Sequence, residues 1–308
     1  MLPEQCRSDG SRSSNGSPRI GIMGLGVVGS AVRSYFEAQE HRPRLYDPCL
    51  GLGSRREINE AQVIFICVPT PYRERGGFGL SAVEEAVALL NPGKIVVIKS
   101  TVLPGTTDAL QRRYPDQRVL FNPEFLREAT AYEDFLRPDR QIVGCTELSW
   151  PAAGEVMSLL PKAPFMRVVA AAEAEMSKYV TNAFLAVKVS FANEIYDLCT
   201  ALGINYEAVR PLVAADARIG PSHLDVFYDG YRGYGGKCLP KDTRSLMDLA
   251  RAAGVSLRLL RAAHDVNQTP LSTVRSRKKV ERLDEARGNR EQPGSASPHP
   301  GSERRLVA

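Results

Sequence analysis

The sequence predicts an α/β protein in which a doubly wound parallel sheet is followed by an all-helical domain. Up to about residue 172, short apolar runs of strand length alternate with helical patterns, an arrangement that produces parallel sheets. After that point one long amphipathic helical pattern replaces the alternation. The sequence therefore indicates two domains, at residues 19–172 and 173–270.

The two ends of the chain lack the large apolar residues that a folded core needs. Residues 1–18 are rich in Ser, Gly and Arg and have no apolar run of the kind found in secretory signals. Residues 271–308 hold nine Lys/Arg and five Asp/Glu, a net of +4 out of +5 for the whole chain. We expect both ends to be disordered, and nucleic-acid binding has little support outside the basic tail.

Composition and cysteine spacing limit the class of protein. With 43% hydrophobic and 24% charged residues, the chain matches soluble globular proteins. No apolar run reaches the roughly 20 residues that cross a bilayer, so no membrane contact is expected. The six cysteines are scattered without metal-ligand spacing, which predicts free thiols in a reducing cytoplasm and no metal site.

A glycine pattern follows the first predicted strand, residues 19–23, and leads into a helical pattern. A strand, a glycine turn and a helix are the context in which GxGxxG binds the pyrophosphate of a dinucleotide. The glycines permit a tight turn and close approach of phosphates, and the N–H groups of the helix N-terminus face the ligand. The predicted cofactor-binding residues here are Gly24, Gly26, Val27, Val28 and Gly29.

A carboxylate ends the second predicted strand, residues 44–46. This residue, Asp47, lies 18 residues after Gly29. A carboxylate at that place can accept both ribose hydroxyls and repels a 2′-phosphate, so NAD is favoured over NADP. A solvated Asp47 without a function is the alternative.

Two later apolar runs, residues 61–68 and 94–99, are continuous, as expected for strands covered on both faces. Each is followed by a polar cluster, which contains Thr70 in the first case and Thr101 in the second. Ligands of an open parallel sheet lie outside the carboxyl ends of its strands, so both threonines are candidates for the cofactor cleft. Either can equally be a helix cap. Further strands are predicted at residues 118–121 and 141–143.

Two carboxylates, Glu124 and Glu128, lie between these last two strands. They are four residues apart and share one face of any helix that forms, where they could hold a substrate or a water. An ordinary charged helical face is the alternative.

A single long helix is predicted from Ala174 to about Leu202, ending at Gly203. Lys178 and Asn182 lie one turn apart on it and present two donors to one spot, unless they belong to a solvated stripe. The helix is also a candidate dimer surface, with a plain interdomain strut as the alternative. Its apolar face contains Met176, Val180, Phe184, Val187, Phe191 and Ile195.

The stretch from Gly233 to Asp242 places a thiol, an ammonium and a carboxylate within five residues. Pro240 suits the first turn of a helix, which puts Cys238 at the helix N-terminus beside Lys241. Both features favour the thiolate, the form that attacks carbon. Asp242, about one turn further on, could orient a water near the sulfur. A buried structural cysteine beside a glycine turn is the alternative.

Six segments between about Arg19 and Asn267 together resemble the UDP-glucose 6-dehydrogenase family, within the wider UDP-glucose/GDP-mannose dehydrogenase superfamily. They read GIMGLGVVGSAV, KSTVLPGTT, FNPEFLRE, AEMSKYVTNAFLAVKVSFANEI, ARIG and GYGGKCLPKD, in that order. The resemblance implies a Rossmann-type NAD-binding domain, a helical domain that forms a homodimer through the long helix, NAD as cofactor and a nucleotide sugar, foremost UDP-glucose, as substrate.

The resemblance also implies roles for single residues. Cys238 is expected to be the nucleophile. The residues implied around it are Lys178, Asn182, Glu124 and Asp242. Those implied near the nicotinamide are Glu128, Lys241 and Thr101, the last also in a catalytic role. Substrate contacts are implied for Glu124, Phe125, Leu126, Lys178, Asn182, Gly235 and Arg218, the last acting across subunits.

Two departures from the family pattern are visible. The family usually has glycine after the Phe-Leu-Arg-Glu stretch, where this chain has Ala129. The family also carries a C-terminal domain that covers the UDP, whereas the match fades after Asn267. We therefore expect this chain to lack that domain.

The implied reaction is an NAD-dependent four-electron oxidation of the C6 alcohol of a nucleotide sugar, UDP-glucose to UDP-glucuronate, through a cysteine thioester. Two alternatives stay open. One is a two-electron dehydrogenase of the 6-phosphogluconate or β-hydroxyacid type, which shares the Lys-x-x-x-Asn pattern but needs no thiol. The other is a catalytically impaired NAD-binding dimer.

Overall fold

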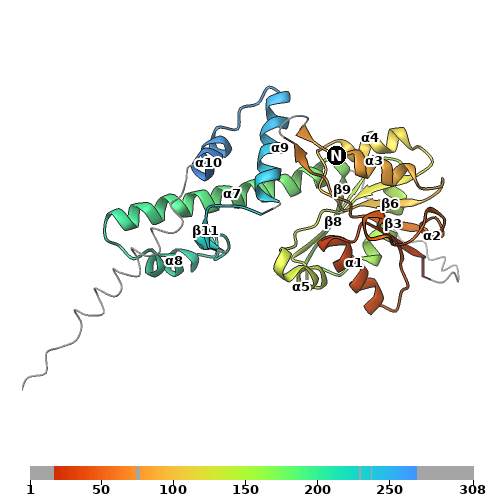
Figure 1. Ribbon diagram of the computed structural model, residues 1–308, viewed down its shortest axis with the longest axis horizontal. Coiled ribbons are helices and arrows are strands. Elements are labelled where there is room, and N and C mark those ends of the chain that lie inside the picture. The colour runs from red at the N-terminus through yellow and green to blue at the C-terminus, as the bar shows by residue number, and fades with distance from the viewer. Residues whose placement is uncertain (1–16, 74–76, 229, 237, 269–308) are drawn as a thin grey trace, which may run out of the picture. The chain divides into compact units, whose positions relative to one another are not determined.

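The computed structural model describes residues 17–73, 77–228, 230–236 and 238–268 of the 308-residue chain (Figure 1). The two predicted disordered ends therefore lie almost wholly outside the described residues. The chain divides into two compact units. Among the described residues, the first unit comprises those from 17 to 186 together with those from 235 to 261, and the second comprises those from 187 to 234 together with 262–268.

A seven-stranded sheet forms the centre of the first unit, with the strand order β2-β1-β3-β6-β7-β8-β9. Its strands are β1 (Ile20–Met23), β2 (Arg44–Tyr46), β3 (Val63–Ile66), β6 (Ile95–Ile98), β7 (Arg118–Phe121), β8 (Arg140–Cys145) and β9 (Phe165–Ala170). All neighbours pair in parallel except β7 and β8, which are antiparallel. A short hairpin, β4 (Tyr72–Arg73) with β5 (Gly77–Phe78), lies outside this sheet.

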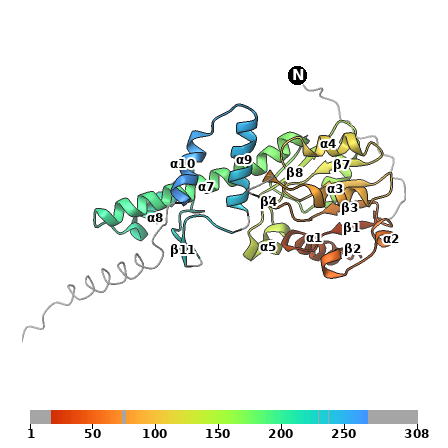
Figure 2. The same cartoon turned by 45° about the horizontal axis from the view of Figure 1, so that its top comes forward.

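Helices cover both faces of the sheet, so the predicted doubly wound α/β fold is confirmed. Figures 1 and 2 show α1 (Val27–Ala38) and α5 (Ala131–Leu136) on one side and α3 (Ser81–Ala88) and α4 (Thr106–Arg113) on the other. The remaining helices are α2 (Arg55–Ile58), α6 (Ala153–Leu159), α7 (Ala171–Ala201), α8 (Tyr206–Ala214), α9 (Leu239–Ala252) and α10 (Arg258–Gln268). Short 3₁₀ turns occupy Pro48–Leu50, Glu128–Thr130 and Trp150–Ala152.

The central strands are apolar because both of their faces are buried. Every residue of β3 is buried, and so is nearly all of β6, as the continuous apolar runs predict. Strand β9 is not among the strands predicted from the sequence. Among the described strands it pairs with β8 alone, and its residues are exposed or half-buried, so it lacks the continuous apolar pattern of the central strands.

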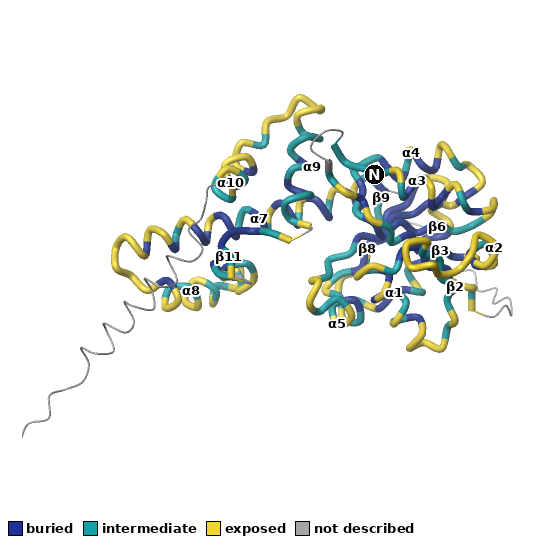
Figure 3. Tube along the Cα trace, viewed as in Figure 1, coloured by how far each residue is buried: buried dark blue, intermediate teal, exposed yellow. Residues whose placement is uncertain are grey.

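The long helix α7 forms as predicted and begins directly after β9. Its first turns pack on the sheet at Gly144, where an added Cβ would lie 2.6 Å from Cβ of Ala174. It ends before Gly203, which has a left-handed φ of 71° and so permits the chain to turn away. Figure 3 shows that buried and exposed residues alternate along α7.

The second unit combines the later part of α7 with α8 and a hairpin of β10 (Phe227–Tyr228) and β11 (Tyr231–Arg232). The predicted helical domain thus contains two short strands. Arg232 is buried there, and its guanidinium is satisfied because it donates to Asn193 and pairs with Asp197 at 2.8 Å. Across the described residues, none of the helices has the length and apolar character needed to span a membrane.

Candidate active site

The glycine turn between β1 and α1 has the geometry of a phosphate-binding loop. Gly24 has a φ of +86°, and a Cβ there would lie 2.8 Å from the carbonyl oxygen of Cys67. A Cβ on Gly29 would lie 1.8 Å from the carbonyl oxygen of Gly24. At Gly26 a Cβ meets nothing within 4 Å, and no side chain caps the N-terminus of α1. Two glycines are therefore required by the fold, while the third leaves space at the helix N-terminus, where a pyrophosphate fits. Val27 and Val28 form the first turn of that helix.

Asp47 lies beside this turn with its carboxylate held by backbone donors. One oxygen accepts from N of Leu25 at 2.7 Å, and the other accepts from N of Cys49 and N of Leu50 at 3.0 and 3.3 Å. The contact with Leu25 ties the end of β2 to the glycine turn, so Asp47 is not a merely solvated residue. The turn and this carboxylate fit a dinucleotide with free ribose hydroxyls.

Thr70 and Thr101 meet at the carboxyl ends of β3 and β6. The Thr70 hydroxyl donates to the carbonyl oxygen of Thr101 at 2.8 Å. Neither residue caps a helix, because α3 begins at Ser81 and α4 begins at Thr106. The helix-cap alternative is therefore wrong for both, and their place in the cofactor cleft stays a prediction.

A buried cluster joins α7 to the loop after β7 and to α9. Nζ of Lys178 lies 3.0 Å from Oε1 of Glu124, and their side chains are only 4% and 10% exposed. Asn182 donates to Oδ2 of the fully buried Asp242 at 2.5 Å. Lys178 and Asn182 therefore do not belong to a solvated stripe.

Glu124 and Glu128 do not share a helical face, so that expectation is wrong. Residues 122–127 form a loop, consistent with Pro123, which disfavours helical backbone at the residue before it. Glu124 points to Lys178, whereas Glu128 is exposed at the start of a 3₁₀ turn. Burial alone would raise the pKa of Glu124, but Lys178, the N–H of Leu126 and Lys99 together hold it below its ordinary value.

Two further residues of this loop, Phe125 and Leu126, are half-buried. The centre of the Phe125 ring lies near two cations, 3.7 Å from the guanidinium carbon of Arg140 and 5.5 Å from Nζ of Lys178. The loop thus places an aromatic face next to the Lys178 ammonium.

Cys238 stands at the N-terminal end of α9, with Pro240 in the first turn as predicted. The residue as a whole is exposed, yet protein atoms around its sulfur desolvate it. This desolvation raises the pKa of the thiol, and so do the charges of Glu124 and Asp242, while Lys178 and Lys241 lower it. The net shift is upward, so the expectation that the site favours the thiolate is wrong.

Desolvation is the largest cause of that upward shift, and Lys241 opposes it only weakly. Its ammonium lies 2.7 Å from Oδ1 of Asp242, so the positive charge is largely compensated by a neighbouring carboxylate. The same ammonium lies 5.0 Å from the centre of the Phe78 ring. Within the described part of the chain, neither Nζ of Lys241 nor Oδ1 of Asp242 makes a hydrogen bond of good geometry, so both have capacity left for a ligand.

Two predicted substrate residues are not brought into this cluster by any described contact. Arg218 lies in the second unit, exposed and paired with Asp216 at 2.6 Å. Its action across subunits stays a prediction. Gly235 is half-buried between Gly233 and Gly236, both of which have positive φ angles, 87° and 72°.

Lys99 and Asn122 belong to the same region but were not predicted. Lys99 is buried, its ammonium donates to Oδ1 of Asn122 at 2.6 Å, and burial lowers its pKa to about 8. Asn122 in turn donates to the carbonyl oxygen of Ile142 at 2.8 Å. The signal available in the sequence was a lysine ending an apolar strand, immediately before the Ser-Thr cluster.

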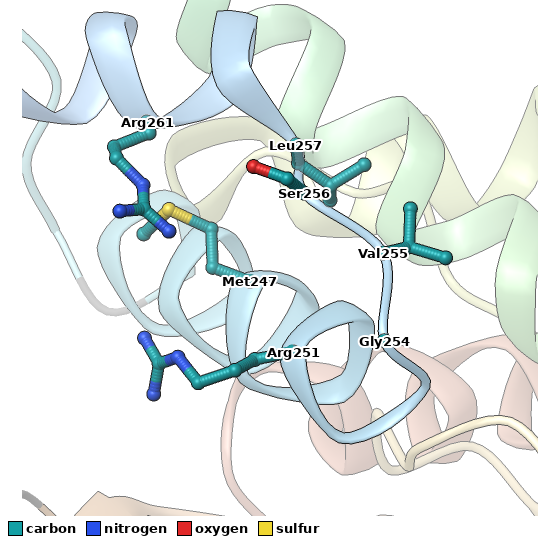
Figure 4. A pocket seen from close by; sticks show the side chains of 7 residues that line it. All are labelled: Met247, Arg251, Gly254, Val255, Ser256, Leu257 and Arg261. Atoms are coloured by element: carbon teal, nitrogen blue, oxygen red, sulfur yellow. The ribbon is translucent and has the colours of Figure 1, made fainter.

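A separate cavity of about 270 Å³ lies between α9 and the start of α10 (Figure 4). It is lined by Met247, Arg251, Gly254, Val255, Ser256, Leu257 and Arg261. No predicted site residue lines it. Among the residues that the structure describes, no His, Cys, Asp or Glu side chains are grouped as metal ligands, and the five described cysteines are free.

Comparisons with known proteins identify the family that this chain matches. Residues 52–158 match the NAD binding domain of the UDP-glucose/GDP-mannose dehydrogenase family, and residues 172–269 match its central domain. A solved UDP-glucose dehydrogenase from Pyrobaculum islandicum is 31% identical, with a TM-score of 0.74 over 91% of this chain and 73% of that chain.

Curated relatives extend the same picture. The UDP-glucose 6-dehydrogenase of Pseudomonas aeruginosa is 42% identical over 230 residues, which is 68% of this chain and 49% of the relative. That of Haloferax volcanii is 38% identical over 232 residues, 68% of this chain and 53% of the relative. The chain thus spans about half the length of these relatives. A Mycobacterium tuberculosis 3-hydroxyisobutyrate dehydrogenase, 18% identical with a TM-score of 0.61 over 80% of this chain and 91% of that chain, shares the fold alone.

Proposed function

Because this chain belongs to the UDP-glucose/GDP-mannose dehydrogenase family, we propose that it oxidises the C6 primary alcohol of a nucleotide sugar to a carboxylate with NAD. One observation carries the proposal. Cys238 is the N-cap residue of α9, and the charges of Glu124, Lys178, Lys241 and Asp242 act on its thiol, so two carboxylates and two ammonium groups surround a nucleophile. UDP-glucose is the proposed substrate because the similar proteins from P. aeruginosa and P. islandicum carry it in their names.

The first oxidation converts the alcohol to an aldehyde. Lys178 has N–H donors beyond the one directed at Glu124, and the amide of Asn182 has a second N–H beyond its bond to Asp242. These remaining donors stabilise the substrate oxygen as negative charge develops on it. When bound at the glycine turn, NAD accepts one hydride from the substrate in each of the two oxidations.

The cysteine makes the second oxidation possible. An aldehyde has no hydroxyl hydrogen to lose until a nucleophile adds to its carbon. The sulfur of Cys238 forms a bond to that carbon while the thiol proton moves to the carbonyl oxygen, giving a thiohemiacetal. Loss of a hydride and a proton then leaves a thioester. Because the pKa of Cys238 is raised, we propose that the group waits as a neutral thiol until substrate is bound.

Hydrolysis completes the reaction. Asp242 and Glu124 are carboxylates whose charges act on the Cys238 thiol, and either can serve as the base that activates a water molecule. Water adds to the thioester carbon, the carbon–sulfur bond breaks, the thiol forms again and the carboxylate product leaves. The balance is one alcohol and one water converted to one carboxylate, with four electrons removed as two hydrides and three protons released to solvent, the first of them the hydroxyl proton lost when the alcohol becomes the aldehyde.

The decisive experiment counts NADH per sugar nucleotide. With UDP-glucose, two NADH per molecule oxidised are expected. One NADH per molecule of another hydroxyl substrate would instead indicate a two-electron dehydrogenase. Production of none, with NAD still bound, would indicate an impaired NAD-binding protein.

The variant Cys238→Ser tests the thioester directly. A serine alkoxide leaves an ester far less readily than a thiolate leaves a thioester. We therefore expect the variant to stall after partial oxidation, with an ester on residue 238 that mass spectrometry of the intact chain detects, while NAD affinity stays as in wild type. Normal turnover by this variant would remove the thioester from the mechanism.

A further inference from the structure

Glu175 is a buried carboxylate that the proposed reaction does not use. It lies on α7, one turn before Lys178, and is 0% exposed. Its Oε2 accepts a hydrogen bond from N of Gly105 at 2.6 Å. Its Oε1 accepts two more from Thr107, from the backbone N at 2.8 Å and from the hydroxyl at 2.6 Å.

These contacts hold the N-terminus of α4. Gly105 is the N-cap residue of that helix and has no side chain with which to cap it. The carboxylate of Glu175, on the separate helix α7, caps the N-terminus of α4 instead. Its negative charge is favourable there because a helix N-terminus carries partial positive charge. At the other end of the same loop, the carbonyl oxygen of Thr101 accepts from the hydroxyl of Thr70. The loop from Thr101 to Gly105 is therefore attached at both ends.

One of these attachments connects the loop to the catalytic helix. Lys178 and Asn182 lie three and seven residues after Glu175, and all three are buried, so they lie on one face of α7. We propose that Glu175 is a positioning residue that fixes the Thr101 loop to α7 and thereby sets the affinity for NAD. The inference rests on the proposed place of Thr101 near the cofactor.

The state of this carboxylate decides how well it holds the loop. Burial raises the pKa of Glu175 to about 7, the donors of Thr107 and Gly105 lower it, and Asp108 raises it. Tyr179 is the other titratable neighbour, and burial together with Asp242 and Glu175 raises its pKa. Ionised Glu175 accepts at both oxygens. In protonated Glu175 one oxygen carries a hydrogen and becomes a donor. The three donors of Gly105 and Thr107 then share fewer acceptor lone pairs.

The test is the affinity of the full chain for NAD, measured by titration calorimetry between about pH 6 and about pH 8.5. We expect wild type to bind NAD several-fold more weakly at the acid end, with a midpoint near pH 7. Glu175→Gln preserves size but cannot ionise, so its affinity should be about tenfold lower at pH 8 and constant with pH. The matched control is Glu173→Gln, an exposed carboxylate two residues earlier, which should keep the wild-type profile.

A second variant separates positioning from simple loss of stability. Thr107→Val removes the hydroxyl donor but keeps the backbone N–H and the carboxylate. Loss of this donor raises the pKa of Glu175 further, so the midpoint should move upward, and this variant decides the matter if Glu175→Gln does not fold. A wild-type affinity that is constant with pH, an unmoved midpoint in Thr107→Val, or a wild-type profile in Glu175→Gln would overturn the proposal. If wild type bound no NAD at all, the cofactor assignment itself would fall instead.

Discussion

Asp47 is tied to the backbone of the glycine turn, because one of its carboxylate oxygens accepts a hydrogen bond from N of Leu25. We expect its negative charge to repel the 2′-phosphate of NADP and its remaining lone pairs to accept the ribose hydroxyls of NAD. We predict that Asp47→Ala narrows the ratio of NADP to NAD dissociation constants by about tenfold or more, equal to about 1.4 kcal/mol. Asp47→Asn, which can keep the acceptor for Leu25, separates loss of charge from loss of that contact. An unchanged ratio in both variants would show that another residue sets the preference.

Cys238 provides a prediction about pH at the same scale. Desolvation, Glu124 and Asp242 raise the pKa of its thiol above the ordinary value of 9.0. Only the thiolate reacts with iodoacetamide. The alkylation rate of Cys238, measured without ligands, should therefore keep rising about tenfold per pH unit beyond pH 9. Peptide mass spectrometry follows residue 238 separately from the other cysteines. A rate that levels off below pH 8 would contradict the raised pKa.

Among the secondary-structure elements, α7 has an unusual division of residue types. Lys178, Asn182 and Glu175 are buried on one face, whereas Phe184 and Phe191 are 63% and 57% exposed on the other. The exposed apolar residues of the helix are Met176, Val180, Phe184, Phe191 and Leu198, with Leu202 just after its end. An exposed apolar stripe of this length indicates an interaction surface, and a second copy of this chain is the proposed partner.

Dimer formation through this stripe is testable by charge insertion. The double variant Phe184→Glu/Phe191→Glu should raise the dimer dissociation constant at least about 100-fold, because it places carboxylates into an apolar contact. Sedimentation velocity at micromolar concentration gives the readout. Leu148→Glu, which also changes an exposed leucine to glutamate but in the first unit, should remain dimeric like wild type. A wild-type chain that sediments as a monomer at that concentration would contradict the prediction.

In the molecule as a whole, the residues assigned to the cofactor belong to the first unit, and so does the single tryptophan, Trp150. Tryptophan fluorescence therefore reports the unfolding of the unit that is expected to bind NAD. At a free NAD concentration of about 100 times the dissociation constant, binding should stabilise this unit by about 2.7 kcal/mol. The midpoint temperature of unfolding, followed by Trp150 fluorescence, should therefore be higher with NAD than without it.

Gly26→Val is the matched test of where that NAD binds. A Cβ at Gly26 meets no atom within 4 Å, so the variant should fold, but its side chain occupies the space in front of the N-terminus of α1. We expect the unfolding midpoint of this variant not to rise when NAD is added. Gly154→Val adds the same side chain at another open position, on α6, and should keep the rise. An NAD-dependent rise that persists in Gly26→Val would place the dinucleotide elsewhere.

The sequence by itself determined the α/β class, the order of most elements, the glycine turn and the residue types of the cluster around Cys238. These features depend on local backbone conformation and on apolar periodicity, which are visible along the chain: Pro240 starts a helix, Gly203 ends one, and β3 and β6 are continuously apolar. The edge strand β9 was missed because its residues are only half-buried and carry no such pattern.

Only the tertiary structure decided which polar and charged side chains meet. The pairs Lys178–Glu124 and Asn182–Asp242 join residues that are 54 and 60 positions apart in the sequence. Glu175 contacts Gly105, the N-cap residue of α4, which lies 70 positions earlier. Ionisation follows from such contacts and from burial together, neither of which a motif displays. For that reason the motif around Cys238 suggested a thiolate, whereas desolvation and two carboxylates raise its pKa despite Lys178 and Lys241.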